Sequence, residues 1–474
     1  MDPTQLSAAA SSRAIAAGTL SPVALAEAYL DRIAALDNQL HSFVLVLRDE
    51  AIAAAREAEC DIRAGRSKGP LHGVPIGLKD IYQTKGIRTT AGSRRYLDHV
   101  PDADAETWVR LRNAGMILLG KNAMLELAYG EEHPDYGATR NPWDIEYGTN
   151  GSSSGSAAAV AAGLGYGSLG SDTGGSIRLP AAWCGIVGLK PTYGRVSRRG
   201  VFPLSYSLDH CGPLTRTVED CALMMQALAG HDPLDPASAD VPVPDYAASL
   251  DRRLDGMRIG VIRHWHERDA VAGFGAGNEP SAAYVAAFDA GCRTLERLGA
   301  RLVDLRVPPL LDYADANRVI LLAEAYALHE TDFQKRPELF GRHCFARLAL
   351  GAFLSAADYV EAVRRRRELC EATASALAGV DLIVSANATG PAPRIDQVGT
   401  YATFERPSYT APYNLTGLPA LSVPIGFEND LPLAFQIAGK PFGEAAVLHA
   451  GFAFEQASGL FERQPPIAAS LPGR

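Results

Sequence analysis

The chain has 474 residues, of which 47% are hydrophobic and 21% charged, a composition typical of globular proteins. Its formal net charge of −9 at pH 7 argues against nucleic acid and against anionic membrane surfaces as partners. The first residues carry no basic or apolar export signal, and no apolar run reaches the roughly 18 residues of a membrane-spanning helix. We therefore expect a soluble, cytoplasmic protein.

The order of the expected elements indicates the fold class. Ser21 before a proline is typical of a helix N-cap, and the apolar residues from there to Leu36 fall on one helical face. The further elements, in chain order, are a helix over 50–64, an apolar segment over 76–78 that ends at Lys79, a strand over 116–119, a small-residue helix over 156–162, a buried connection over 186–189, strands over 258–262, 302–305, 382–385, 420–424 and 433–438, and helices over 281–298 and 356–378. This alternation predicts an α/β fold with a central mixed β-sheet covered on both faces by α-helices.

We expect the whole chain, residues 1–474, to form one domain. Its three parts are the N-terminal helices (1–66), a core that holds the motifs described below (67–220), and the remainder of the sheet with the substrate-pocket elements (221–474). Residues 231–244, rich in proline and aspartate, are interpreted as a surface loop within this domain. Residues 264–280 are either a lid or a solvated loop.

Seven cysteines are scattered along the chain, and none forms a C-x-x-C pair. This distribution predicts reduced, mostly buried thiols and argues against a disulfide framework and against zinc. A histidine pair and a run of arginines are interpreted as surface features. His264-Trp265-His266 is taken as loop surface, because no third metal ligand lies nearby. The four arginines at 364–367 are taken as a solvated helix face, because Glu361 and Glu368 flank them.

Two serine-rich turns carry the chemistry. Residues 150–156 read N-G-S-S-S-G-S, and residues 171–178 read S-D-T-G-G-S-I-R. The two glycines before Ser176 allow close approach of the backbone and turn successive N–H groups toward one point. A serine hydroxyl beside such donors supplies both a nucleophile and a place for an oxyanion. No histidine accompanies these serines, and the candidate base is Lys79, which ends the run G-V-P-I-G-L-K.

These motifs resemble the amidase signature family. The runs that carry the resemblance are 73–80 (G-V-P-I-G-L-K-D), 141–144 (N-P-W-D), the two serine-rich turns, 184–192 (C-G-I-V-G-L-K-P-T), 212–216 (G-P-L-T-R), 417–419 (G-L-P) and 436–439 (Q-I-A-G). The resemblance covers nearly the whole chain and is densest from about Leu71 to Arg216. The ordered set is far more specific than a lone G-G-S.

The resemblance implies a Ser-Ser-Lys triad. In this triad Ser176 is the nucleophile, Ser152 the bridging serine and Lys79 the general base. It also implies a cis peptide bond between Gly151 and Ser152. The oxyanion hole would consist of four successive backbone N–H groups, those of Thr173, Gly174, Gly175 and Ser176. The supporting residues would be Gly151, Ser153, Asp172 and Arg178, the last two as a buried pair that fixes the shape of the nucleophile loop.

The proposed base must be neutral, because an ammonium group has three donors and no lone pair with which to take a proton. Burial disfavours the charged form and lowers the pKa of a lysine. The apolar approach over residues 74–78 fits such burial. The neighbouring Asp80 would oppose it if its carboxylate pointed toward Lys79.

The expected activity is that of a stand-alone hydrolase that cleaves a carboxylic amide, or a related aryl amide, carbamate or ester, through an acyl-enzyme. Its partner would be a small-molecule amide, with no nucleic acid, no membrane, no metal and no organic cofactor; a homodimer is left open. The residues taken to suggest an apolar pocket that accepts an aryl group are Phe353, Tyr401, Phe404, Tyr409 and Tyr413.

Two alternatives compete with this interpretation. The first is the glutaminase subunit of a tRNA-dependent amidotransferase, which shares S-D-T-G-G-S-I-R; Leu179 and Pro407 stand where that subunit would hold glutamine with polar side chains. The second is a Ser-His-Asp α/β-hydrolase, because residues 151–155 match G-x-S-x-G with Ser153 as nucleophile. Residues 142–149, however, do not form the apolar strand that such an elbow needs. The turn also departs from the family form, with Thr149, Asn150 and Ser154 in place of proline and two glycines.

Overall fold

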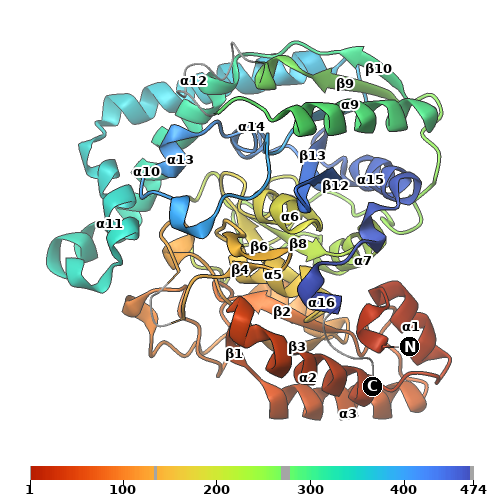
Figure 1. Ribbon diagram of the computed structural model, residues 1–474. Coiled ribbons are helices and arrows are strands. Elements are labelled where there is room, and N and C mark those ends of the chain that lie inside the picture. Colours follow the sequence, from red (N-terminus) through yellow and green to blue (C-terminus); the bar gives the residue numbers. More distant parts are fainter. Residues whose placement is uncertain (1, 133–135, 268–277, 470–474) are drawn as a thin grey trace.

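The computed structural model describes residues 2–132, 136–267 and 278–469, and one sheet of 11 strands runs through it (Figure 1). The strands lie in the order β1-β3-β2-β6-β8-β7-β12-β13-β11-β9-β10. Parallel pairs join β3 to β2 to β6 at one end and β11 to β9 to β10 at the other, whereas the pairs between them are antiparallel. The predicted mixed sheet is therefore confirmed.

Most strands are short and buried. They are β1 (Phe43–Val46), β2 (Pro75–Lys79), β3 (Ile117–Asn122), β6 (Gly167–Asp172), β7 (Val187–Lys190), β8 (His210–Thr215), β9 (Arg258–Ile262), β10 (Arg301–Asp304), β11 (Leu382–Ala386), β12 (Ala420–Glu428) and β13 (Leu431–Gly439), with β4 (Arg140–Asn141) and β5 (Asp144–Gly148) as a separate small ribbon.

Helices flank the sheet on both sides. They are α1 (Ala8–Ala16), α2 (Pro22–Leu40), α3 (Arg48–Arg63), α4 (Glu106–Asn113), α5 (Ser154–Ala161), α6 (Arg178–Cys184), α7 (Val218–Leu228), α9 (Ala282–Arg297), α10 (Leu310–Lys335), α11 (Arg342–Leu348), α12 (Ala356–Leu377), α13 (Ala402–Glu405), α14 (Ala411–Leu415), α15 (Glu444–Ser458) and α16 (Pro466–Ala469). Helices α9 and α15 pack on one face of the β12–β13 hairpin. There Gly291 of α9 lies against Phe435, and Gly451 of α15 lies against Leu421. Helix α6 packs on the opposite face, where Arg178 contacts Gln436.

Several predicted boundaries agree closely with the structure. Strand β9 has the predicted bounds, and Ser21 caps α2 by accepting hydrogen bonds from Val23 N and Ala24 N at 3.1 and 3.2 Å. Helix α2 continues to Leu40, beyond the predicted end. The connection predicted over residues 186–189 is strand β7. The single-domain boundaries stay a prediction, although one buried cluster runs from Ala8 to Phe454.

Strand β6 was not predicted, and its composition explains why. It reads G-S-L-G-S-D, with a single large apolar residue, yet every position is buried. Small residues are required because neighbours approach closely: a Cβ on Gly170 would lie 2.7 Å from Leu214 Cδ1. A strand that is buried by close backbone approach lacks the apolar run that identifies most buried strands.

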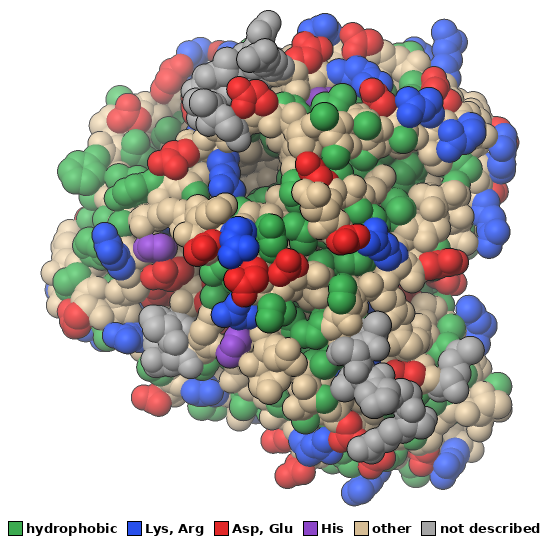
Figure 2. Space-filling view, in the orientation of Figure 1, with side chains coloured by type: hydrophobic (Ala, Val, Ile, Leu, Met, Phe, Trp, Pro, Cys, Tyr) green, Lys and Arg blue, Asp and Glu red, His purple; other side chains and the backbone are tan. Residues whose placement is uncertain are grey.

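The cysteines follow the sequence interpretation, and the surface patterns follow it in part. Five of the seven cysteines are buried, all seven are free, and no helix among the described residues is long and apolar enough to cross a membrane. Figure 2 shows acidic and basic side chains interspersed over one face of the molecule. Arg364 forms ion pairs with Glu361 and Glu368, both at 2.6 Å, as expected for a solvated face. Arg366 departs from this expectation, because it is half-buried and its Nε donates to Leu415 O at 2.7 Å.

The histidine pair near residue 265 does not lie on a surface loop, contrary to the sequence interpretation. Trp265 and His266 are buried rather than on the surface, because Trp265 packs edge-on against Tyr313 and His266 against Phe288. Burial lowers the pKa of His266 to about 4, so this side chain is neutral near pH 7. Of the predicted lid or loop over 264–280, residues 268–277 lie outside the described part of the chain.

Candidate active site

Lys79 is the last residue of β2, a central strand that pairs with β3 on one side and β6 on the other. Its side chain is completely buried. Its Nζ lies 2.7 Å from Ser152 Oγ, 3.0 Å from Ser153 Oγ and 2.8 Å from Ser171 Oγ. The structure therefore brings a buried amine against three hydroxyl groups from two other elements.

The surroundings of Lys79 favour its neutral form. Burial lowers its pKa to about 7, and the more distant Asp172, Cys211 and Asp209 oppose that shift only in part. No ion pair with Lys79 occurs among the described residues. Asp80, which could have opposed the shift, has its Oδ2 bound to Thr90 N at 2.9 Å and its Oδ1 3.4 Å from Lys121 Nζ. Its carboxylate thus pairs with another lysine.

Ser152 and Ser153 lie in the turn that precedes α5. The expected cis peptide bond between Gly151 and Ser152 is present. Residue 151 must be small, because a Cβ there would overlap the side chain of Leu125, whose backbone N–H donates to Ser152 O at 3.2 Å. Ser153 Oγ donates to Ser171 O at 3.3 Å, which links this turn to β6.

Ser176 lies in the turn between β6 and α6 and is half-buried. Within the described chain its hydroxyl forms no hydrogen bond, to Ser152 or to any other group, so the structure does not show the two serines hydrogen-bonded. The preceding Gly175 has φ +134°, and a Cβ there would collide with the Thr410 hydroxyl. Only glycine fits this position, because L side chains rarely adopt that backbone conformation.

Asp172 and Arg178 form the expected buried pair. Arg178 Nε lies 3.1 Å from Asp172 Oδ2, and Arg178 Nη2 lies 3.0 Å from Oδ1. Asp172 also accepts hydrogen bonds from Gly175 N at 2.8 Å and Ile177 N at 3.1 Å. Burial would raise the pKa of Asp172, but the Arg178 guanidinium outweighs it and holds the pKa well below its usual range. A single carboxylate thus binds the turn at Gly175, Ile177 and Arg178.

The same interactions correct the predicted oxyanion hole. The backbone N–H of Gly175 points to Asp172 and is not free for an oxyanion. By contrast, no hydrogen bond in the described part of the chain uses the N–H groups of Thr173, Gly174 or Ser176. Gly175 is therefore excluded from the predicted set of four donors, and the other three stay a prediction.

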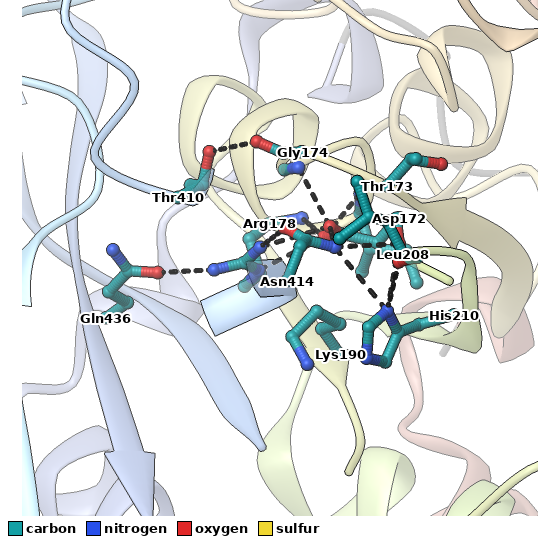
Figure 3. A network of polar contacts seen from close by, with 12 residues as sticks. Asp172, Thr173, Gly174, Arg178, Lys190, Leu208, His210, Thr410, Asn414 and Gln436 are labelled. Atoms are coloured by element: carbon teal, nitrogen blue, oxygen red, sulfur yellow. Dashed lines mark hydrogen bonds and ion pairs between the residues drawn. The ribbon is translucent and has the colours of Figure 1, made fainter. Parts of the chain in front are cut away.

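Residues from the C-terminal half complete the support of this turn, although the motifs assigned them no role. Arg178 Nη1 donates to Gln436 Oε1 at 2.8 Å and Nη2 to Asn414 Oδ1 at 2.7 Å. Asn414 Nδ2 in turn donates to Asp172 Oδ1 at 2.8 Å. Thr410 Oγ1 donates to Gly174 O at 2.5 Å. Figure 3 shows Arg178 between Asp172 and Gln436, with Asn414 against the Asp172 carboxylate.

Lys190 and His210 lie close to this network, and His210 Nδ1 is 3.3 Å from Asp172 O (Figure 3). Burial lowers the pKa of Lys190 and of His210 well below the ordinary values. Lys190 Nζ donates to Pro191 O at 2.9 Å, and His210 Nδ1 lies 2.6 Å from Leu208 O. Arg178 is consequently the cation that pairs with Asp172.

The aromatic side chains predicted to form a pocket do not come together. Phe353 is 85% exposed and Tyr401 46% exposed. Tyr413 is buried, with its hydroxyl 2.8 Å from Ser385 Oγ. Tyr401 and Phe404 do contact each other, with ring centroids 6.2 Å apart. A surface-open cavity of about 430 Å³ lies between β9, β10 and α9, but its lining holds none of the predicted site residues.

A buried lysine bound to serine hydroxyls, beside a glycine-rich serine turn on a mixed sheet, is the arrangement of an amide-cleaving hydrolase. The chain belongs to the amidase family, whose sequence model matches residues 24–448. It is therefore an amide-hydrolysing enzyme, as the motifs predicted.

Particular relatives sharpen this assignment. The chain is 40% identical to a glutamyl-tRNA(Gln) amidotransferase subunit of Moorella thermoacetica, over 94% of each chain. A peptide amidase from Stenotrophomonas maltophilia superposes with a TM-score of 0.84 at 34% identity, covering 97% of this chain and 98% of that one. A structure described as a vestigial protein complex that reveals the origins of an s-triazine catabolic enzyme superposes with a TM-score of 0.88 at 33% identity, over 96% and 99% of the two chains.

Proposed function

We propose that Lys79, Ser152 and Ser176 form the catalytic triad of a stand-alone amidase. The observation that carries the proposal is the 2.7 Å contact between Lys79 Nζ and Ser152 Oγ, both buried, with no carboxylate of the described residues at ion-pair distance from Lys79. A neutral amine there has a lone pair with which to accept the Ser152 proton. Ser176 lies on the adjoining turn, and its own N–H is one of the backbone donors that make no hydrogen bond among the described residues.

In the proposed reaction, Ser176 Oγ attacks the amide carbonyl while its proton passes to Ser152 and the Ser152 proton passes to Lys79. The N–H groups of Thr173, Gly174 and Ser176 stabilise the oxyanion. The protons then return through Ser152 to the leaving nitrogen, and the C–N bond breaks to give an acyl-enzyme and an amine. Water, deprotonated along the same path, releases the acid and regenerates Ser176.

The Ser152–Ser176 hydrogen bond is the link of this relay that the described residues do not form. Catalytic hydrogen bonds often shorten only in the enzyme–substrate complex. The proposal requires this link to form in the enzyme–substrate complex.

A glutaminase subunit is the second candidate, and the 40% identity to an amidotransferase subunit favours it. Against it stand Leu179 and Pro407, where that subunit would place polar side chains. Both are half-buried and apolar, and an apolar side chain cannot compensate the ammonium of free glutamine. We therefore favour hydrolysis of a small-molecule amide without a partner chain.

A hydrolysis panel separates these candidates. Purified protein should be assayed on aliphatic amides, anilides, amino-acid amides, carbamates, esters and glutamine, with Ser176→Ala as the control. We expect turnover of at least one amide other than glutamine, and labelling of Ser176 by a fluorophosphonate. Efficient ammonia release from glutamine alone would favour the glutaminase subunit. Labelling of Ser153 instead would favour the α/β-hydrolase elbow and exclude this triad.

A further inference from the structure

We infer that Ser171, together with Ser153, stabilises Lys79 as an ammonium ion during turnover and takes the place that a carboxylate counter-ion would otherwise fill. This inference rests on the proposed role of Lys79 as the base. It assigns a positioning role to Ser171, a residue outside the proposed triad, which lies in β6 next to Asp172.

The hydrogen-bond count at Lys79 changes during the proposed reaction. A neutral amine has two N–H donors and one lone pair, whereas an ammonium group has three donors. Three hydroxyl oxygens lie within hydrogen-bond distance of Nζ, at 2.7, 3.0 and 2.8 Å. When Ser152 gives its proton to Lys79, all three oxygens can accept a hydrogen bond from the new ammonium. The site thus satisfies the charged form completely.

Hydroxyl groups and carboxylates would act differently at this position. A carboxylate carries a permanent charge and favours the protonated lysine before the reaction begins, which would remove the base. A hydroxyl group is neutral and stabilises the ammonium only by accepting a hydrogen bond. The nearby groups with formal charge or titrating character, Asp172, Asp209 and Cys211, act on Lys79 from a greater distance. Asp172 and Asp209 are themselves bound to Arg178 and to Thr173.

Ser171 is the more suitable of the two serines for a test of this role. Its side chain is 5% exposed, and the one hydrogen bond of its hydroxyl within the described residues goes to Lys79. Ser156 offers a matched control on the neighbouring helix α5. Ser156 is fully buried, and its Oγ donates at 3.1 Å to Leu169 O of β6, the strand that also holds Ser171. It forms no hydrogen bond with Lys79 among the described residues.

The experiment compares Ser171→Ala, Ser171→Thr and Ser156→Ala with the wild type over pH 5–10, on whichever amide the panel identifies. Ser171→Ala leaves an ammonium donor without an acceptor, so the charged form of Lys79 is destabilised. We expect kcat at the plateau to fall about tenfold to a hundredfold, because hydrogen bonds to charged groups are among the stronger ones. KM should stay within about twofold of the wild-type value. In the pH profile of kcat, the acid limb, where kcat rises with pH, should move to lower pH.

Ser171→Thr keeps the hydroxyl. In this variant and in Ser156→Ala, the acid limb of the kcat profile should stay at the wild-type pH and kcat should lie within about threefold of the wild type. Thermal unfolding checks that each variant is folded, and Ser171→Cys, with a weakly accepting sulfur of similar size, replaces the alanine variant if that one is unstable. A limb that stays in place or moves to higher pH in Ser171→Ala, or an equal effect in Ser156→Ala, would overturn the inference. An inactive wild type, or full activity in Lys79→Arg, would instead overturn the proposed triad.

Discussion

Two fully buried lysines lie on neighbouring strands of the sheet, Lys79 at the end of β2 and Lys121 near the end of β3. Lys121 is in register with Leu78, the residue before Lys79. Because successive side chains of a strand point to opposite faces, the two amines leave the sheet on opposite sides. Their burial is the same, but their partners differ.

Lys121 has the partners of a structural cation. Its Nζ donates to Tyr82 O at 2.6 Å and to Thr89 Oγ1 at 2.8 Å, and it lies 3.4 Å from Asp80 Oδ1. Lys79 has three hydroxyl groups and no carboxylate at ion-pair distance in the described chain. Burial lowers the pKa of both lysines, but Asp80 opposes this shift directly at Lys121. Between these two lysines, the counter-ion rather than burial therefore separates the structural cation from the candidate base.

Lys79→Arg should have the strongest effect on activity. Arginine keeps the positive charge but cannot give up its proton in a protein, so the base is removed. We expect kcat/KM at neutral pH to fall by about 10⁴-fold, the scale seen when one member of a catalytic unit is removed. The measurement is steady-state kinetics on folded protein. If this variant keeps roughly half of the wild-type rate, Lys79 is a positioning cation and not the base.

Lys121→Met should affect stability instead of chemistry. It leaves the Asp80 carboxylate buried without its cation, and breaking a buried pair in this way costs about 3–5 kcal/mol. Denaturant unfolding measures this loss, and the double variant Asp80→Asn/Lys121→Met should recover part of it. Activity per folded molecule should change much less than in Lys79→Arg. The contrast between the two lysines fails if Lys121→Met is as stable as the wild type yet inactive.

Asp172→Asn tests the carboxylate that shapes the turn that holds Ser176. It weakens the acceptor of Arg178 and of two backbone N–H groups, so we expect kcat to fall by about a hundredfold. The folded-state pKa of Asp172 is depressed, so its contribution to stability is complete above the unfolded value of about 4 and is lost as the pH falls through the folded pKa. The free energy of unfolding should therefore fall less steeply from pH 5 to pH 2 in the variant than in the wild type. An equally steep loss of stability in both proteins would contradict this role.

A change at Thr410 should have the mildest effect. Thr410→Val removes the hydrogen bond to Gly174 O and keeps the volume, so kcat should fall about three- to tenfold. Thr416→Val is the matched control, because Thr416 Oγ1 donates at 2.8 Å to Pro412 O, away from the turn that holds Ser176. Identical kinetics of the two variants would show that Thr410 does not support the turn.

Local patterns predicted the parts of the fold that have local causes. The strand at β9 is a short apolar run bounded by polar residues, and the start of α2 has a capping serine and a proline. Strand β6 escaped prediction because its burial depends on glycines that neighbouring strands approach closely. The long helix α10 also received no assignment, because it packs against α11, α12 and α14 and its buried residues are spread around the helix.

The candidate site likewise has residues that the motifs predicted and residues that only the structure identifies. The family motifs identified Lys79 and the two serine turns, and the structure places Ser152 against Lys79. The residues that hold Arg178 lie 236 and 258 positions away, at Asn414 and Gln436. Gln436 belongs to the Q-I-A-G run of the resemblance, so a signal was present, but a single sequence does not show which side chains meet across such separations. That Gly175 N–H is bound to Asp172 could be learned only from the geometry of the turn.

A titration of the Lys79 amine itself tests the role of this residue as the base without relying on turnover. The chain has seven lysines, few enough for each side chain to give a separate signal with ¹³C label at Cε, and the spectrum of Lys79→Met identifies Lys79 by difference. We predict that its signal titrates with a midpoint of about 7, the value to which burial lowers the pKa. A Lys79 signal that remains that of an ammonium ion up to about pH 10, the range of an ordinary lysine, would contradict the assignment of this residue as the base.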